Sequence, residues 1–190
     1  TRLLSTSKLH TQGSLINTGN ALDISIEGDG FFQVLMPDGR VGYTRSGAFS
    51  RNAEGNVVTA SGHPLQPELT IPPEALSINI ASDGIVSVQM PGEVEAEEVG
   101  QIALADFPNR QGLQPNGESM LMQSPASGEP IVAAPFAEGM GRTVQGSLES
   151  SNVNVVQELV DMIETQRAYE VSSKTITSVD EMMRYLAQNV

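Results

Sequence analysis

The sequence predicts a mainly β protein with a long C-terminal α-helix: an antiparallel β-rich domain, sandwich or barrel-like, followed by a single helix. Between residues 21 and 145, short apolar runs alternate with Gly, Pro, Asn and Asp, which is typical of short strands joined by turns. Between residues 154 and 188 there is no Gly or Pro, and apolar residues recur three and four positions apart, which is typical of a helix.

The first predicted hairpin occupies residues 31–44. Residues 31–36 are apolar enough to be buried on both faces of a strand, and residues 41–44 form the returning strand. The connection Pro37-Asp38-Gly39-Arg40 contains an Asp-Gly pair, in which Gly39 supplies the positive φ of a tight turn. Before the hairpin, residues 22–26 alternate between apolar and polar side chains, which predicts a half-buried strand.

The same pattern continues toward residue 145. It predicts further strands at residues 48–51, 57–60, 76–81, 85–90, 99–107 and 120–123. Gly30 follows an Asp between two apolar runs and is predicted to have positive φ, as Gly39 is. Gly84, in the run Ser82-Asp83-Gly84, is predicted to be a third structural turn.

The helix is predicted to begin after Asn154, whose side chain can cap it, with Gln157 completing a capping-box pattern. About 36 residues of helix extend roughly 54 Å, at 1.5 Å per residue. Because this exceeds the width of the β-rich domain, the apolar stripe of the helix predicts a partner helix. The predicted assembly interface consists of Val155, Val156, Leu159, Met162, Ile163, Tyr169, Ile176, Met183 and Leu186.

These elements predict four segments. Residues 1–20 are expected to be an extended connecting segment, and residues 21–145 a β-rich outer domain. Residues 146–153 are expected to be a connector, and residues 154–190 a coiled-coil-type helix.

Charge and composition exclude several classes of partner. The net charge of −13 disfavours binding to nucleic acid or to anionic lipid surfaces, because phosphate groups repel an acidic chain. No apolar run is long enough to span a bilayer, so no membrane insertion is expected. The absence of Cys excludes disulfides, thiolate metal sites and thiol catalysis.

Candidate catalytic and metal-binding motifs are isolated. His10 and His63 lack the nearby second ligand that a metal site needs. The Ser-x-x-Lys pattern at residues 5–8 lacks the Ser-Asp-Asn and Lys-Thr-Gly motifs that accompany it in penicillin-interacting enzymes. Residues 27–30 lack the spaced acidic ligands of a calcium loop and are better explained as a turn. The sequence therefore predicts no catalytic residue, no metal and no cofactor, and a protein that is not an enzyme.

Several motifs occur in a characteristic order along nearly the whole chain. They are LHTQG at 9–13, GDGFFQV at 28–34, YTRSGAF at 43–49, SNVNVVQELV at 151–160 and QRAYE at 166–170. In this order they resemble the bacterial flagellar rod and hook family. The family's N-terminal helix has no counterpart in this sequence, so the helix at 154–188 is expected to lack its natural partner.

The resemblance implies a structural subunit of the distal rod, a self-assembling tube that transmits motor torque to the hook. It implies that terminal helices form an inner coiled-coil layer and that β-rich domains form the outer layer. The implied partners are further copies of the chain, other rod proteins, the hook protein, the surrounding ring proteins and the flagellar export machinery. The implied location is the basal body, from periplasm to outer membrane, after type III export without a cleaved signal peptide.

Two alternatives stay open at this point. One is a proximal rod or hook paralogue of the same family, although a hook subunit normally carries an additional outer domain. The other is a secreted, β-rich adhesive or binding domain with a helical stalk. Exposed aromatic residues would favour that class, but the chain has no Trp and only three Tyr residues.

Overall fold

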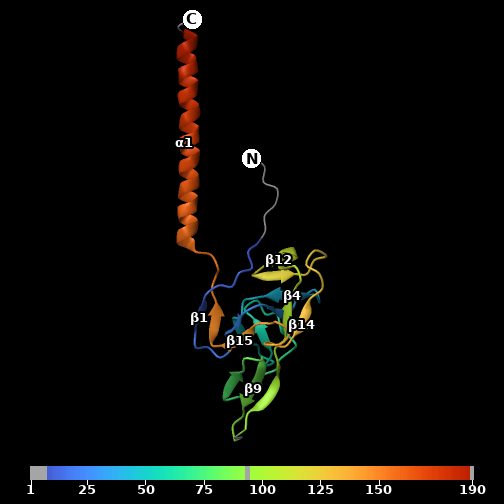
Figure 1. Cartoon of the computed structure of the whole chain (residues 1–190). Coiled ribbons are helices and arrows are strands. Elements are labelled where there is room, and N and C mark those ends of the chain that lie inside the picture. Colours follow the sequence, from blue (N-terminus) through green and yellow to red (C-terminus); the bar gives the residue numbers. More distant parts are fainter. Residues whose placement is uncertain (1–7, 93–94, 189–190) are drawn as a thin grey trace. The chain divides into compact units, whose positions relative to one another are not determined.

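The computed structural model describes residues 8–92 and 95–188, with helix side chains described as far as Tyr185. The chain divides into two compact units, Thr1–Ser150 and Ser151–Val190. The first unit is built from antiparallel strands and the second contains one α-helix, as Figure 1 shows. The predicted fold class, mainly antiparallel β with a C-terminal helix, is confirmed for the described residues.

The β-rich unit contains sixteen described strands and a short 3-10 helix, Arg110–Gly112. The strands are β1 (Leu15–Asn17), β2 (Ile24–Glu27), β3 (Phe31–Leu35), β4 (Val41–Thr44), β5 (Phe49–Arg51), β6 (Val57–Thr59), β7 (Leu65–Gln66), β8 (Ser77–Ile80), β9 (Ile85–Gln89), β10 (Glu97–Gln101), β11 (Leu104–Asp106), β12 (Gln114–Gly117), β13 (Met120–Met122), β14 (Ile131–Ala133), β15 (Arg142–Gln145) and β16 (Ser147–Glu149).

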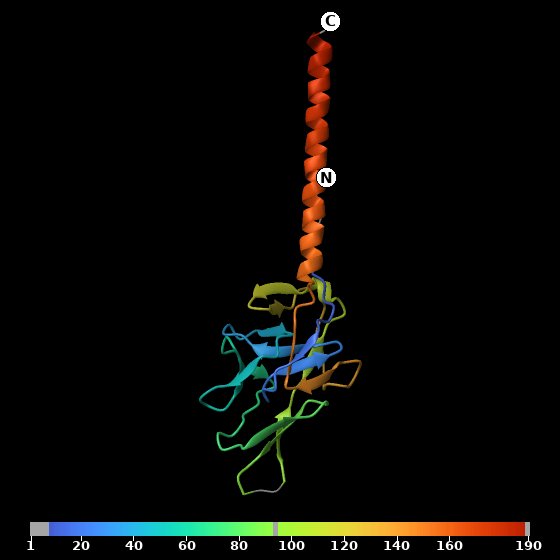
Figure 2. The ribbon, with the colours of Figure 1, turned by 90° about the vertical axis from the view of Figure 1, so that its left-hand side faces the viewer.

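The main sheet has seven strands in the order β12-β13-β4-β3-β11-β14, with β7 also paired to β3. The predicted hairpin forms its centre, because β3 and β4 pair antiparallel with Leu35 opposite Val41. A separate three-stranded sheet has the order β10-β9-β8. Figures 1 and 2 show this sheet at one end of the β-rich unit and β12 at the other.

The prediction of a single strand at residues 99–107 is wrong. The segment is divided between β10 in the three-stranded sheet and β11 in the main sheet. Ile102 lies at the division, where its side chain is fully buried and its amide donates to the carbonyl of Gly84 at 2.9 Å. A continuous apolar pattern therefore spans a change of sheet, which periodicity alone does not reveal.

The strand predicted to be half-buried at residues 22–26 is more enclosed than its alternation indicates. Ile24, Ser25 and Ile26 are all buried in β2, which pairs with β15. The polar side chain in this series is satisfied, because the hydroxyls of Ser25 and Ser147 lie 2.6 Å apart. The alternation thus reflects a buried polar contact and not a solvent-facing side of the strand.

Two apolar clusters form the core of the β-rich unit. The larger includes Ile24, Ile26, Phe32, Val34, Phe49, Leu65, Ile71, Val86, Val88, Ile102 and Leu104. The smaller contains Phe31, Tyr43, Ala105, Phe107, Leu113 and Leu121. The Tyr43 and Phe107 rings meet edge to face with centroids 4.7 Å apart, a favourable aromatic geometry. Both clusters include residues of the main sheet, and the larger also includes residues of β2, β5 and β9, so it joins the main sheet to its neighbours.

The helix α1 runs from Val155 to Gln188. Asn154 caps it as predicted, because its Oδ1 accepts from the amides of Val156 (3.1 Å) and Gln157 (3.4 Å). The side chain of Gln157 instead donates to Asp161 at 2.9 Å, along the helix and not back toward the cap. In the described part of the chain, no helix is long and apolar enough to cross a membrane.

Candidate assembly surface and its junction

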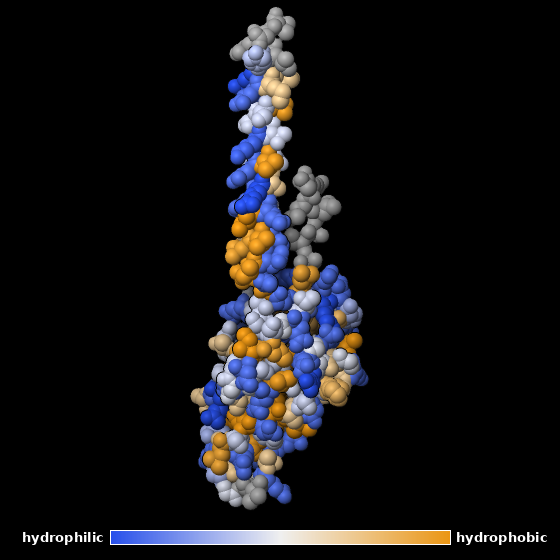
Figure 3. All heavy atoms as spheres, turned by 60° about the vertical axis from the view of Figure 1, so that its left-hand side comes forward, coloured by the Kyte–Doolittle hydropathy of each residue, from blue (hydrophilic) through white to orange (hydrophobic). Residues whose placement is uncertain are grey.

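The predicted assembly residues lie on an exposed helix. Side chains from Val155 to Tyr185 are all exposed, including large apolar ones, and Figure 3 shows hydrophobic residues gathered along the helix beside hydrophilic ones. Val155, Val156, Leu159, Met162, Ile163, Tyr169, Ile176 and Met183 are between 48% and 77% exposed. Leu186, the last predicted interface residue, has its side chain outside the described part. The interface role of this stripe stays a prediction.

A second apolar line on α1 is absent from the predicted set. Val160, Val171 and Met182 are exposed and spaced eleven residues apart, which is about three helical turns, so they lie on one side of the helix. At 100° per residue, Val160 lies about 200° around the helix from Met162 but only about 40° from Val156 and about 60° from Ile163, so this line widens the predicted stripe. The eleven-residue spacing is visible in the sequence and would have identified this line. An apolar band this wide favours a helix that packs against more than one neighbour.

The β-rich unit is closed by a two-stranded ribbon. Strands β1 and β16 pair antiparallel, with Leu15 opposite Glu149 and Asn17 opposite Ser147. Residues 15–17 belong to the segment expected to be an extended connection, and residues 147–149 to the expected connector. The two ends of the β-rich unit therefore leave it side by side, and we call this ribbon and its contacts the junction.

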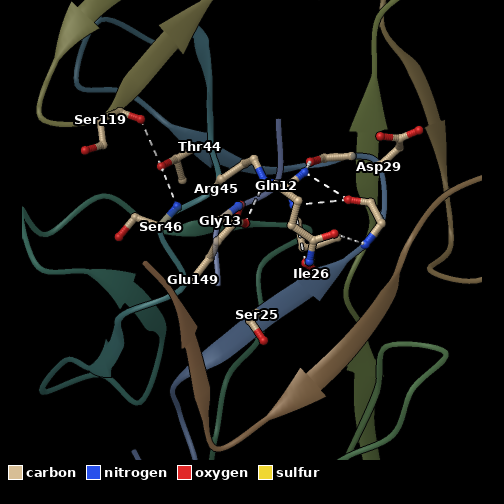
Figure 4. A network of polar contacts seen from close by, with 12 residues as sticks. Gln12, Gly13, Ser25, Ile26, Asp29, Thr44, Arg45, Ser46, Ser119 and Glu149 are labelled. Carbon is tan, nitrogen blue, oxygen red and sulfur yellow. Dashed lines mark hydrogen bonds and ion pairs between the residues drawn. The ribbon is translucent and has the colours of Figure 1, made fainter. Parts of the chain in front are cut away.

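Arg45, just after β4, holds the junction to the body of the unit (Figure 4). Its Nε donates to Glu149 Oε2 at 2.7 Å, and the two side chains are 21% and 8% exposed. Nη1 donates to the carbonyls of Gly28 (3.1 Å) and Gly30 (3.0 Å). Nη2 donates to the carbonyls of Ile26 (3.3 Å) and Gly28 (3.1 Å). The planar guanidinium thus uses all its donors to join β16 to the turn between β2 and β3.

The chain preceding β1 is held to the same place. The amide of Gly13 donates to Glu149 Oε1 at 2.8 Å, so both carboxylate oxygens of Glu149 are used. Gln12 donates through Nε2 to the carbonyl of Ile26 at 3.2 Å and accepts at Oε1 from the amide of Gly28 at 3.1 Å. Figure 4 shows these side chains converging from separate segments of the chain. The junction is therefore a shared polar network and not a single ion pair.

Charged groups beside the junction are paired. Arg110 binds Asp106 at 2.7 Å and Asp29 at 2.6 Å, and its hydrogen bond holds the pKa of Asp29 below the usual value. His10 meets the ring of Phe31 edge to face at 6.1 Å. Burial lowers the pKa of His10, and nearby cations, including Arg110, lower it further. This shift favours the neutral form of His10, whose ring packs against Phe31.

The remaining candidate chemical motifs have structural settings. Glu27 pairs with Arg142 at 2.7 Å across β2 and β15. His63 closes a turn in which its amide donates to the hydroxyl of Thr59 at 3.1 Å. Residues 5–7 of the Ser-x-x-Lys pattern lie outside the described residues. Within the described residues, no group of three or more His, Cys, Asp or Glu side chains could hold a metal ion.

The three turn glycines adopt positive φ: +127° at Gly30, +80° at Gly39 and +83° at Gly84. A further glycine is required for a different reason. A Cβ at Gly47 would lie 1.5 Å from the carbonyl oxygen of Ile24, so the backbone could not approach so closely with any other residue. Gly47 is in the YTRSGAF motif, but its neighbour is more than twenty positions away, and no local turn pattern identifies the contact.

Comparison with known proteins gives a consistent family. The family "Flagellar hook protein FlgE/F/G D1 domain" matches residues 25–88, which span β2 to β9. The family "Flagellar basal body rod FlgEFG protein C-terminal" matches residues 144–189, which include β16 and the helix. Arg45 lies in the first matched region and Glu149 in the second, whereas β1 lies in neither.

Comparison with individual proteins shows which members of this family the chain resembles. A flagellar basal-body rod protein FlgG of Buchnera aphidicola from Schizaphis graminum is 46% identical over 187 residues, covering 98% of this chain and 72% of that protein. The FlgG protein of Caulobacter vibrioides is 40% identical over 95% of this chain and 69% of its own. The FlgF protein of the same organism is 34% identical over 92% and 67%. The chain belongs to the FlgG family of flagellar basal-body rod proteins.

Proposed function

We propose that this chain is a structural subunit of the distal rod and that the exposed stripe of α1 is its main assembly surface. Subunits polymerise through their helices into the inner layer of a tube, and their β-rich units form the outer layer. The higher identity to FlgG than to FlgF within one organism supports the distal member over its rod paralogue. The proposal includes export without a cleaved signal peptide, contacts with hook and ring proteins, and no catalytic activity.

The observation that carries this proposal is the exposed helix. A helix of 34 residues with large apolar side chains open to solvent is unfavourable in an isolated subunit, because each buried side chain of this type stabilises a folded state by about 1.5–3 kcal/mol. Burial against neighbouring helices recovers this stabilisation. A wide apolar band on one helix favours more than one neighbouring helix, which suits a tube better than a helix pair.

Torque transmission follows from the covalent connection between the two units. The β-rich unit ends at Ser150 and the helical unit begins at Ser151. A force passing along this connection first meets β16, whose Glu149 is bound by Arg45 and by the amide of Gly13. The junction therefore spreads the load from one strand over the β-rich unit.

The test places a charge in the stripe. Ile163→Asp buries an unpaired carboxylate in any packed layer, at a cost of several kcal/mol per subunit. The expected result is loss of polymer in electron micrographs and loss of swimming, with the melting of the β-rich unit unchanged. Ile163→Leu is the matched control, because it changes the same side chain without introducing a charge. Normal swimming by the Ile163 variant would refute the assembly role.

A further inference from the structure

The last strand of the main sheet has a free edge. Strand β14 pairs with β11 on one side, and among the described residues no strand pairs with its other side. Ile131 and Val132 are 49% and 50% exposed. Because neighbouring residues of a strand point to opposite faces, this edge presents apolar side chains on both faces of the sheet. An edge of this kind is ready to pair with another chain.

Two other free edges of the same unit, those of β12 and β10, are protected. Strand β12, at the opposite edge of the main sheet, contains Pro115 and a register shift between Pro115 and Gly117. Strand β10 carries Glu97 and Glu98 and has a register shift before Gly100. Proline, charge and irregular register each discourage edge-to-edge pairing. Strand β14 is only three residues long and follows Pro130, but it contains no Pro or charged residue itself and pairs with β11 in regular register.

Phe136, just after β14, supports a contact at the same place. Its side chain is 78% exposed, and its φ of +66° is a conformation that bulky residues rarely adopt. The amide of Phe136 donates to the carbonyl of Gly141 at 3.0 Å, which holds the loop in this form. A strained backbone that exposes an aromatic ring is unfavourable in the isolated subunit and typical of a recognition site.

The charge distribution indicates what covers this edge. Residues 131–137 contain no ionisable side chain, whereas the chain as a whole carries a net charge of −13. Two copies repel each other wherever their acidic surfaces meet, and a neutral apolar edge avoids that repulsion. A basic partner would instead be drawn to the acidic surfaces elsewhere. The uncharged edge therefore fits a second copy of this chain.

We propose that the edge of β14, with Phe136, forms a lateral contact between the β-rich units of neighbouring copies. This proposal rests on the proposed function, because it requires that the chain polymerises. The contact joins β14 of one copy to a different surface of the next, since a helical polymer is built from head-to-tail contacts and not from self-complementary ones. The rod is thus held by two surfaces, the helix stripe and the β14 edge.

The first experiment measures polymerisation of the intact protein by sedimentation. Val132→Lys places a charge on the edge and is expected to raise the critical concentration by on the order of tenfold. Gln101→Lys, on the protected edge of β10, is the control and is expected to leave it unchanged. Both positions are exposed, so circular dichroism and melting of the unpolymerised variants should match those of the unaltered protein. An unchanged critical concentration for the Val132 variant overturns the proposal.

A second experiment does not depend on weakening the polymer. Because the chain contains no Cys, Val132→Cys introduces a single thiol. Its reaction with a maleimide is expected to be slower in pelleted polymer than in the supernatant, by on the order of tenfold, because a covered thiol reacts less readily. The thiol of Gln101→Cys is expected to react equally fast in both. Equal rates for the Val132 thiol overturn the lateral contact.

The outcomes separate this inference from the proposed function. If the unaltered protein polymerises, Ile163→Asp abolishes the polymer, and the two Val132 variants behave like the unaltered protein, then only the β14 contact is overturned. If the unaltered protein forms no sedimentable polymer at any concentration, both the proposed function and the lateral contact are overturned. If Val132→Lys raises the critical concentration and the Val132→Cys thiol is protected, both are supported.

Discussion

Arg45 and Arg40 are both ion-paired arginines, yet their surroundings differ. Arg40 contacts Asp38 two residues away, and the two side chains are 66% and 44% exposed. Arg45 contacts Glu149 and three backbone carbonyls and is largely enclosed. Exposed pairs contribute little to stability, whereas removing one partner of an enclosed pair leaves an uncompensated charge. The stability of the β-rich unit should therefore depend on Arg45 and hardly on Arg40.

Arg45→Lys is expected to lower the free energy of unfolding by about 2–3 kcal/mol, because an ammonium group cannot reproduce the five donors of the guanidinium fork. Arg40→Lys is expected to change it by less than about 0.5 kcal/mol. Urea unfolding followed by circular dichroism measures both. Equal effects of the two substitutions would mean that the junction does not stabilise the unit.

Residue-level prediction from the sequence succeeds where the cause is local. The positive φ of Gly39 follows from an Asp-Gly pair between two apolar runs, and all of these residues are neighbours in sequence. The role of Arg45 depends on Glu149, more than a hundred positions away, and on carbonyl groups, which carry no sequence signal. The YTRSGAF motif draws attention to Arg45, but the motif does not indicate which groups Arg45 binds.

At the scale of elements, strands joined by a local turn are predicted correctly, and strands that depend on distant partners are not. The hairpin of β3 and β4 is predicted correctly because a recognisable turn fixes its register. The pairing of β1 with β16 is missed because the paired residues are at least 130 positions apart, and three-residue strands carry little periodicity. The division of residues 99–107 into two strands is missed because a change of sheet preserves the apolar pattern.

The junction predicts where the β-rich unit can be cut. A chain of residues 1–150 is expected to unfold in one cooperative transition with β-type circular dichroism. A chain of residues 1–145 lacks β16, so Arg45 loses Glu149 and Ser25 loses the hydroxyl of Ser147. Its free energy of unfolding is expected to be lower by about 3 kcal/mol or more. Calorimetry compares the two, and equal melting temperatures would contradict a structural role for β16.

At the scale of the whole molecule, net charge opposes assembly. Each copy carries a net charge of −13, and polymerisation brings many copies together. The apolar stripe of α1 must therefore overcome repulsion that salt can reduce.

Raising the NaCl concentration from about 0.01 M to about 0.15 M shortens the screening length from roughly 30 Å to roughly 8 Å. The critical concentration for polymerisation is expected to fall over this range, as measured by sedimentation. Glucose at matched osmolarity is the control for effects that do not depend on charge. A critical concentration that rises with salt would indicate that ion pairs between copies, and not apolar burial, hold the polymer.

The pairing of β1 with β16 has a consequence for how such a chain can vary. Since the strands that lead into and out of the β-rich unit lie side by side, the unit is inserted into the chain as a closed module. The segment between β1 and β16 can be lengthened, shortened or exchanged without changing the spacing of these two strands. Variation in the outer surface of a rod can thus accumulate in this module while the polymerising helix keeps its sequence.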